Sequence, residues 1–299
     1  MSRVFSTMPF NTEIKPLSAM TDEEVAGIHT VITDVDDTVT TDGRLTAKAY
    51  TALEQLQSAG FRVVVTTGRP AGWCDHIARM WPVDAVVGEN GAVYFWYDSH
   101  GNKLCSRHAV SDVDAAAHRQ RIEQVAAKIL RAVPGAAVAS DQFCRLYDLA
   151  IDFCEDVAFI GQAGVDAVVA IMASEGMTAK VSSIHVNGWF GVHDKLSTSM
   201  SMMQHLYDID LNAERSRIVY AGDSPNDATM FAHFPISVGV ANVLDFVGKM
   251  SAMPKFVTNE RSGAGFAELA DRLLSQLSTS AQSRRDPLSC GRRRNLRQT

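Results

Sequence analysis

Two short apolar segments of this chain each run directly into a pair of aspartates, although almost two hundred residues separate them. VITDVDDT contains Asp34 and Asp36, and IVYAGDSPND contains Asp223 and Asp227. Each apolar run has the length of a buried strand and is followed by a polar loop. We expect both strands to belong to one sheet, with the carboxylates gathered at its carboxyl edge. Crowded carboxylates repel one another unless a cation lies between them, and a hard, oxygen-binding ion such as Mg²⁺ fits that chemistry.

The segments around these motifs alternate between strand and helix patterns. HTVITD is typical of a strand, LTAKAYTALEQLQSAG of an amphipathic helix ended by Gly60, and FRVVVTTG of a second apolar strand. VDAVVGE predicts a third strand, and RIVYAGD and ISVGVA resume the series later in the chain. Strand, helix and strand in this order predict an α/β fold with a Rossmann-like, parallel-sheet core.

The pattern changes between the two halves of this series. AVYFWYD with KLCSRH is typical of a hairpin, as is KVSSIHV with WFGVH, where Asn187-Gly188 would form a two-residue turn. Helix patterns lie between these hairpins, so the middle section is predicted to be an inserted α+β cap domain. The predicted boundaries are an N-terminal arm at 1–27, a catalytic core at 28–88 and 190–278, the cap at 89–189, and a basic, disordered tail at 279–299.

Charge and composition limit the classes of function. The formal net charge is −6, but the last 21 residues hold six arginines and one acid, so the remainder has 22 basic against 33 acidic residues. Such an acidic body argues against nucleic acid as the main partner, because DNA binding depends on clustered Lys and Arg. No apolar run approaches the ~20 residues of a membrane helix, and no secretory signal is recognisable, so we expect a cytoplasmic protein. Five cysteines without metal-type spacing indicate reduced thiols.

Four motifs together resemble a known family. DVDDT, TTGRP, Lys195 and GDSPND resemble, in order and spacing, the signature motifs of the haloacid dehalogenase-like (HAD) hydrolases. The resemblance covers nearly all of residues 28–278. An insertion between the second and third motifs is similar to that of subfamily IIB, the Cof-like, sugar phosphatase type, whose α/β cap is called C2B. This resemblance implies a Rossmann-like core with an inserted cap and a magnesium-dependent hydrolase.

The resemblance also implies roles for the acidic residues. Asp34 would be the nucleophile that forms an aspartyl-phosphate, and Asp36 the general acid and then general base. The family's dehalogenases lack an acid at the position of Asp36, which argues against dehalogenation here. Asp34, the backbone carbonyl of Asp36 and the carboxylate of Asp223 would hold Mg²⁺, and Asp227 would support these ligands from outside or reach the ion through water. Asn226 would orient the phosphate or a metal-bound water.

The loop after the second apolar strand is a candidate phosphate-binding site. A hydroxyl and a loop amide at Thr67 and Gly68 are well placed to donate hydrogen bonds to phosphate oxygens. Thr66 is the competing hydroxyl, and Thr67 is favoured because it directly precedes Gly68, as in the family's TGR pattern. Arg69 either reaches phosphate or substrate, or faces solvent or the cap.

Further candidates lie at the two connections between core and cap. Lys195 would neutralise the nucleophile and the transferring phosphoryl group, although Leu196 follows it where many relatives have glycine. Glu89 and Asn90, with the adjacent glycine, are the candidate specificity residues at the first connection. His185 either contacts substrate or packs within a sheet.

The sequence as a whole predicts a magnesium-dependent phosphatase that hydrolyses a small phosphorylated metabolite through an aspartyl-phosphate, with a sugar phosphate as the expected substrate. A sugar phosphomutase, which shares the nucleophile and metal but returns the phosphoryl group to a sugar, is one alternative. A catalytically idle, phosphosugar-binding regulatory protein is another. The sequence indicates no oligomeric state.

Overall fold

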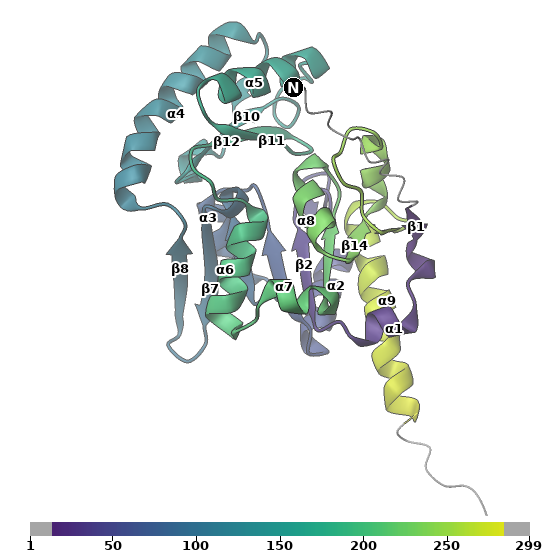
Figure 1. Cartoon of the computed structure of the whole chain (residues 1–299). Helices are drawn as coiled ribbons and strands as arrows, with labels where there is room; N and C mark the ends of the chain where they lie inside the picture. The colour runs from purple at the N-terminus through teal and green to yellow at the C-terminus, as the bar shows by residue number, and fades with distance from the viewer. Residues whose placement is uncertain (1–13, 284–299) are drawn as a thin grey trace, which may run out of the picture.

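The computed structural model describes residues 14–283, and within them the largest element is a nine-stranded sheet (Figure 1). Its centre consists of β13 (Ile218–Gly222), β2 (Thr30–Asp34) and β5 (Arg62–Thr66), which run parallel and are almost entirely buried. β14 (Ile236–Gly239) and β6 (Ala85–Gly88) flank this centre in the same direction. The prediction of a Rossmann-like parallel core is confirmed.

Alternate residues of the central strands pack on opposite faces of the sheet, as the two-residue period of a strand requires. Val31 and Val63 belong to one hydrophobic cluster, whereas the neighbouring Ile32 and Val64 belong to another. Helices cover both faces, so consecutive residues in the middle of these strands are apolar. The first face carries α2 (Ala47–Ser58), α3 (Ala71–Met80) and α9 (Ser262–Ser283), and the second carries α6 (Lys195–Tyr207), α7 (Leu211–Glu214) and α8 (Ala228–His233).

The hairpin predicted at the start of the cap forms, but it extends the core sheet. β7 (Val93–Asp98) pairs antiparallel with β6, and β8 (Lys103–His108) pairs with β7 (Figure 1). The cap boundary predicted at residue 89 therefore lies before two strands of the core sheet. The local sequence pattern identified the hairpin. Which sheet the hairpin joins depends on the unpaired edge of β6, and a local pattern does not reveal that edge.

The cap contains a four-stranded antiparallel sheet that lies over the carboxyl edge of the core sheet (Figure 1). Its central strands are β10 (Asp148–Asp152) and β12 (His185–Trp189), and helices α4 (Asp112–Ala132) and α5 (Gln162–Ser174) pack on one face. The outer strands are β9 (Ala137–Val138) and β11 (Thr178–Val181). The prediction of a core with an inserted α+β cap is confirmed.

The predicted turn at Asn187-Gly188 is wrong. Both residues lie inside β12, where Asn187 pairs with Ala150 of β10 and with Lys180 of β11. The chain turns earlier, at residues 182–184 between β11 and β12. An Asn-Gly pair favours a turn only locally, and two neighbouring strands outweigh that preference here.

Residues 14–27 lie against the core. β1 (Lys15–Pro16) pairs with β15 (Phe256–Val257), and α1 (Asp22–Ala26) follows, with Leu17 and Met20 buried. The first half of the predicted arm, residues 1–13, lies outside the described residues. So do residues 284–299 of the predicted basic tail, whereas α9 continues to Ser283.

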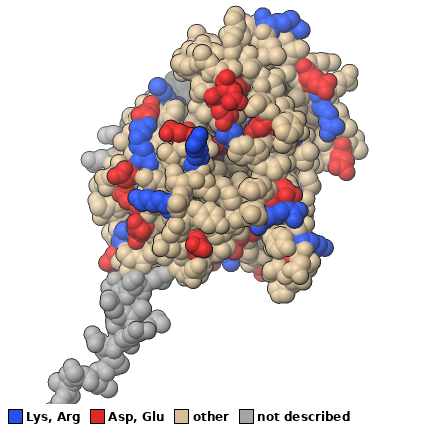
Figure 2. All heavy atoms as spheres, turned by 180° about the vertical axis from the view of Figure 1, so that it is seen from behind, with Lys and Arg blue, Asp and Glu red and all other residues tan. Residues whose placement is uncertain are grey.

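The remaining elements are short. They are β3 (Thr40–Thr41), β4 (Arg44–Leu45) and the 3-10 helices η1 (Leu17–Ala19), η2 (Glu89–Gly91), η3 (Gln142–Cys144), η4 (Arg215–Arg217), η5 (Pro225–Asp227) and η6 (Ala241–Phe246). Figure 2 shows basic and acidic side chains interspersed on the face turned away from the viewer of Figure 1. Within residues 14–283, no helix has the length and apolar character needed to cross a membrane. The four described cysteines are free, and Cys290 lies outside the described part of the chain.

Candidate active site

Three of the four predicted aspartates meet at the carboxyl edge of the core sheet. Asp34 ends β2, Asp223 directly follows β13, and Asp227 ends η5. One carboxylate oxygen from each lies within 4.8 Å of the others, and all three residues are buried. β2 and β13 are neighbours in register, which is why residues so distant in sequence converge.

The chemistry of this cluster fits a divalent cation. Burial, followed by repulsion from Asp227 and Asp34, raises the pKa of Asp223. Asp34 also has a raised pKa because of burial, although Lys195 opposes the effect. The Oδ2 atom of Asp223 is buried and has no hydrogen-bond partner among the described residues. A buried carboxylate oxygen without a partner is costly, and a hard cation would provide one.

Lys195 is the cation that the structure places in the cluster. Asp194 caps the start of α6, and the Lys195 side chain that follows is 3 % exposed. Its Nζ lies 2.5 Å from Asp34 Oδ1 and 3.1 Å from Asp227 Oδ1. Burial opposes the ammonium charge, but Asp227 and Asp34 outweigh it and raise the pKa of Lys195. Lys195 is therefore charged and fixed against the predicted nucleophile.

Asp227 supports the site from behind. Its Oδ1 accepts hydrogen bonds from Lys195 and from the Tyr220 hydroxyl, the latter at 2.6 Å. Its Oδ2 accepts from the backbone amides of Asp223 and Ser224 at 3.0 and 3.2 Å. With both oxygens engaged, Asp227 is suited to holding Lys195 and the Asp223 loop in place. Tyr220 was not singled out in the sequence, where it is one apolar-type residue of a buried strand.

Asp36 lies two residues beyond the nucleophile and beside the predicted phosphate-binding loop. Arg69 Nε donates to Asp36 Oδ1 at 2.8 Å, and the Thr67 hydroxyl donates to Oδ2 at 3.4 Å. The Thr66 hydroxyl instead points to the Thr33 carbonyl at 3.5 Å. The structure thus places Thr67, and not the competing Thr66, next to the candidate acid.

Gly68 and Asn226 line the small cavity above Asp34 and Asp36, together with residues of the cap. A Cβ at Gly68 would stand 3.2–3.3 Å from the side chains of Asn90 and Asn187, so the cap approaches the loop closely here. Asn226 is 8 % exposed, and its Oδ1 accepts a hydrogen bond from Ser224 Oγ. Thr38 donates to Asp223 Oδ1 at 3.3 Å, which orders the loop after the nucleophile.

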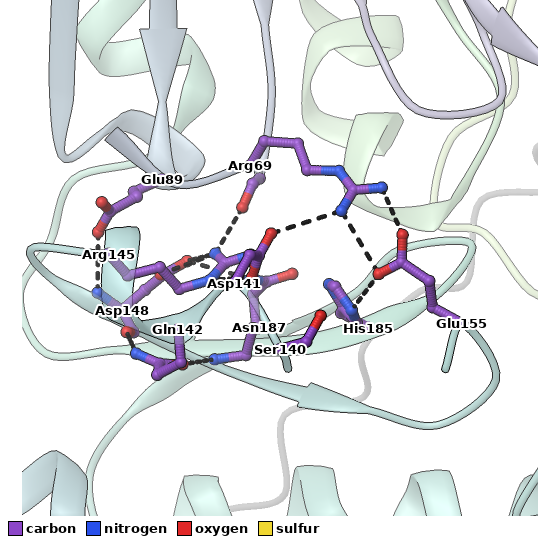
Figure 3. Close-up of polar contacts among 12 residues, drawn as sticks. Arg69, Glu89, Ser140, Asp141, Gln142, Arg145, Asp148, Glu155, His185 and Asn187 are labelled. Atoms are coloured by element: carbon purple, nitrogen blue, oxygen red, sulfur yellow. Dashed lines mark hydrogen bonds and ion pairs between the residues drawn. The ribbon is translucent and has the colours of Figure 1, made fainter. Parts of the chain in front are cut away.

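Arg69 faces the cap, one of the two positions considered for it. Its side chain is 4 % exposed, and its Nη2 lies 2.8 Å from Glu155 Oε1, while Nη1 lies 3.5 Å from Asp141 (Figure 3). His185, from β12, is 2.9 Å from the other oxygen of Glu155. The His185 contact, followed by Arg69, lowers the pKa of Glu155 to about 2. These contacts join the candidate acid of the core to the cap.

Glu89 and Asn90 lie at the junction of core and cap, but their side chains bind protein groups. The two carboxylate oxygens of Glu89 accept hydrogen bonds from four backbone amides, at distances of 2.6–3.1 Å. Those amides belong to Ala71 in the core and to residues 146–148 in the cap. Asn90 has a φ of 54° and donates to Asp148 at 3.4 Å. The adjacent Gly91 leaves no room for a side chain, since a Cβ there would lie 2.2 Å from the Asp194 carbonyl oxygen.

A buried polar network completes this junction (Figure 3). Arg145 donates to Asp148 at 2.9 Å and to the Gly68 carbonyl at 2.7 Å, and Asn187 donates to Asp148 at 3.1 Å. Sequence reasoning did not identify Arg145 or Asp148, and it assigned Asn187 to a turn. The spacing of the two aspartates in DLAID, the sequence of β10, was the available signal, because residues four apart on a strand lie on the same face.

A larger cavity, of about 410 Å³, lies elsewhere, beside the connections between core and cap. It is lined by residues such as Tyr94, His108 and His193, and by none of the predicted catalytic residues. Size alone therefore does not locate the chemistry. The buried carboxylates, the charged lysine and the adjoining loop define the candidate active site.

Comparisons with known proteins agree with this architecture. Residues 31–131 match the family model described as haloacid dehalogenase-like hydrolase. A phosphoglycolate phosphatase of Methanoculleus marisnigri is 27% identical over 247 residues, covering 81% of this chain and 94% of the relative. A second phosphoglycolate phosphatase, from Pyrobaculum neutrophilum, is 27% identical over 253 residues, covering 83% of this chain and 97% of the relative.

Among solved structures, a HAD subclass IIB sugar phosphatase shares the fold. It aligns with a TM-score of 0.55 at 13% identity and covers 83% of this chain and 99% of its own. About a third of the chain thus matches the haloacid dehalogenase-like hydrolase family model, and the chain as a whole shares the fold of a subclass IIB member. The predictions of this family and of a phosphatase enzyme are confirmed.

Proposed function

We propose that the protein is a magnesium-dependent phosphatase that hydrolyses a small phosphomonoester, such as a sugar phosphate, through an aspartyl-phosphate on Asp34. The observation that carries the proposal is the contact between the Asp34 carboxylate and the buried Lys195 ammonium, at 2.5 Å, beside two further buried carboxylates. Lys195 offsets negative charge where a phosphoryl group would approach a carboxylate nucleophile.

Asp34, Asp223 and the backbone carbonyl of Asp36 would hold Mg²⁺, with Asp227 assisting from behind. The bound ion supplies positive charge that offsets the charge of the phosphoryl oxygens. Thr67, the backbone amide of Gly68 and Asn226 would position those oxygens. The unpartnered Oδ2 of Asp223 supports this ligand set.

The positions of Asp34 and Asp36 imply two chemical steps. An Asp34 oxygen attacks phosphorus while the bond between phosphorus and the leaving oxygen breaks, and Asp36 donates a proton to that oxygen. Asp36 then takes a proton from water, whose oxygen attacks phosphorus and displaces Asp34. This sequence regenerates both aspartates and releases inorganic phosphate. Arg69 and Thr67 orient the Asp36 carboxyl for both proton transfers.

The proposal is tested by phosphate release from a panel of phosphorylated sugars and phosphoglycolate, with and without Mg²⁺. We expect magnesium-dependent release that falls at least about a thousandfold in Asp34→Asn. Asp166→Asn, an exposed change on α5, is the matched control and should behave as wild type. Conversion of a sugar phosphate into an isomer without phosphate release would indicate a phosphomutase, and binding without turnover would indicate a regulatory protein.

A further inference from the structure

Two cavities adjoin at the candidate acid. The smaller one, above Asp34, has a volume of about 10 Å³, room for about one water molecule. The larger one measures about 360 Å³, which lies within the ~300–1,000 Å³ typical of sites for small molecules. Asp36, Arg69 and Ile184 line both cavities, so the two spaces lie on either side of these residues.

The proposed chemistry assigns these two spaces different parts of the substrate. The phosphoryl group must reach Asp34, which lines only the smaller cavity, and because that cavity has room for about one water molecule, the cap must draw back from Asp34 to admit it. The leaving oxygen must lie beside Asp36, which receives and donates the proton. The rest of the leaving group then extends past Asp36, away from Asp34. The larger cavity is the space available in that direction.

The larger cavity has a strongly negative lining. Four carboxylates line it, against the single guanidinium of Arg69. Two of them, Asp37 and Asp42, come from the loop after β2, and Glu155 comes from the cap. The other lining residues, Thr40, Gly43, Cys154 and Ile184, carry no charge. Even when Asp36 holds the proton that it donates, three of these carboxylates remain.

Arg69 offsets only one of these negative charges, and protein carboxylates already occupy the donors that would bind an anionic ligand. Its Nε binds Asp36 at 2.8 Å, and Nη2 binds Glu155 at 2.8 Å (Figure 3). Nη1 lies 3.4 Å from Glu155 and 3.5 Å from Asp141. One flat face of the guanidinium also lies over the Trp73 ring, 4.5 Å from its centroid. A carboxylate on a substrate would have to displace one of these partners.

Resting on the proposed function, we infer that this cavity selects leaving groups without negative charge, and that Glu155 and Asp42 are specificity-determining residues. The preferred leaving group is neutral and rich in hydroxyl groups, or carries an amine. Carboxylate oxygens accept hydrogen bonds from both kinds of group, whereas they repel a carboxylate. The two phosphoglycolate phosphatases to which the chain is similar have a substrate whose leaving group is anionic, so the inference separates this chain from them in specificity.

Three phosphomonoesters with a two-carbon leaving group test the inference, because they differ mainly in charge. They are 2-phosphoglycolate, 2-hydroxyethyl phosphate and phosphoethanolamine, whose leaving groups are anionic, neutral and cationic. We expect kcat/KM for the neutral and cationic compounds to exceed that for phosphoglycolate by about tenfold or more. The preference should weaken as salt is raised from low to high concentration, because salt screens exposed charges such as Asp42. Equal or faster turnover of phosphoglycolate would overturn the inference.

Variants of the cavity provide a second test. Glu155→Gln removes one charge and frees Arg69 donors, and Asp42→Asn removes a second charge. Each variant should therefore raise kcat/KM for phosphoglycolate relative to 2-hydroxyethyl phosphate. Glu123→Gln, an exposed change on α4, should leave the ratio unchanged. A ratio unaltered in both cavity variants would contradict the assignment of these residues.

A binding measurement separates this inference from the proposed function. Thermal stabilisation of Asp34→Asn by the same three compounds reports charge selection without any turnover. If wild type hydrolyses none of the compounds or the sugar phosphates, the proposed function fails. The order of stabilisation still decides the inference, because a shift with phosphoglycolate as large as with the other two would overturn it.

Discussion

Lys195 supplies the positive charge that balances the buried carboxylates of the candidate site. It is buried between Asp34 and Asp227, and its ammonium offsets both carboxylates. Lys195→Met keeps much of the volume but leaves buried carboxylates without their cation. In the absence of divalent ions, we expect the free energy of unfolding to fall by about 3–5 kcal/mol. Urea unfolding in a chelating buffer measures this change.

Lys48→Met is a suitable control, because Lys48 is exposed on α2 and its replacement should stay within about 0.5 kcal/mol of wild type. A Lys195→Met protein as stable as the control would contradict the buried charge cluster.

His193 makes a pH dependence of stability testable at a single residue. It is 9 % exposed, its ring stacks on Trp189 with centroids 5.8 Å apart, and burial lowers its pKa from 6.5 to about 4. Below pH 6.5 the unfolded chain therefore binds more protons at this residue than the folded protein does. The resulting loss of stability should build up as pH falls from about 6.5 towards 4, and should be on the order of 1–3 kcal/mol.

The comparison of wild type with His193→Gln isolates this effect from other titrating groups. Stability measured by urea unfolding should fall less in the variant than in wild type between pH 7 and pH 4.5. Parallel curves for the two proteins would mean that His193 is already accessible to protons in the folded state.

At the scale of elements, Glu89 joins three pieces of structure. Its carboxylate accepts amide hydrogen bonds from the start of α3, from the segment before β10 and from the first residue of β10. Glu89→Gln replaces one acceptor oxygen with an NH₂ group, which would face backbone amides that are themselves hydrogen-bond donors. We expect a loss of about 2–4 kcal/mol in stability, measured by urea unfolding. Glu123→Gln on the outside of α4 should be neutral.

The same variant tests whether Glu89 selects the substrate, as the sequence had suggested. Because its oxygens are directed at backbone amides, the order of preference among phosphorylated substrates should stay unchanged in the folded fraction. A reordered preference without loss of stability would instead place Glu89 in contact with substrate.

The elements of the core were predictable because their signal is local. An apolar run such as Val63–Val65 can be buried on both faces only in a sheet covered by helices, and α2 ends near Gly60 as its pattern indicated. Strand pairing, by contrast, depends on two segments at once, and the pattern of one segment does not show its partner. The sequence therefore identified β7 and β8 as a hairpin but assigned them to the wrong sheet, and it placed a turn inside β12.

At the scale of the whole molecule, the site is assembled from segments that the fold brings together. The aspartates and Lys195 were predictable because each follows a strand or begins a helix at one edge of the sheet. Arg145, Asp148 and Glu155 were not, because their importance depends on where the cap meets the core. A single sequence gives the position of the cap along the chain but not which of its side chains face the core.

In the proposed mechanism Asp34 carries the phosphoryl group during catalysis, and acid quenching during turnover detects that intermediate. Wild type would be mixed with a hydrolysed substrate and Mg²⁺, quenched within the first turnover, digested and analysed by mass spectrometry. We expect one phosphoryl group on the peptide that contains Asp34, and none in Asp34→Asn. Phosphate release by Asp34→Asn at the wild-type rate, or a phosphoryl group on a different residue, would contradict this mechanism.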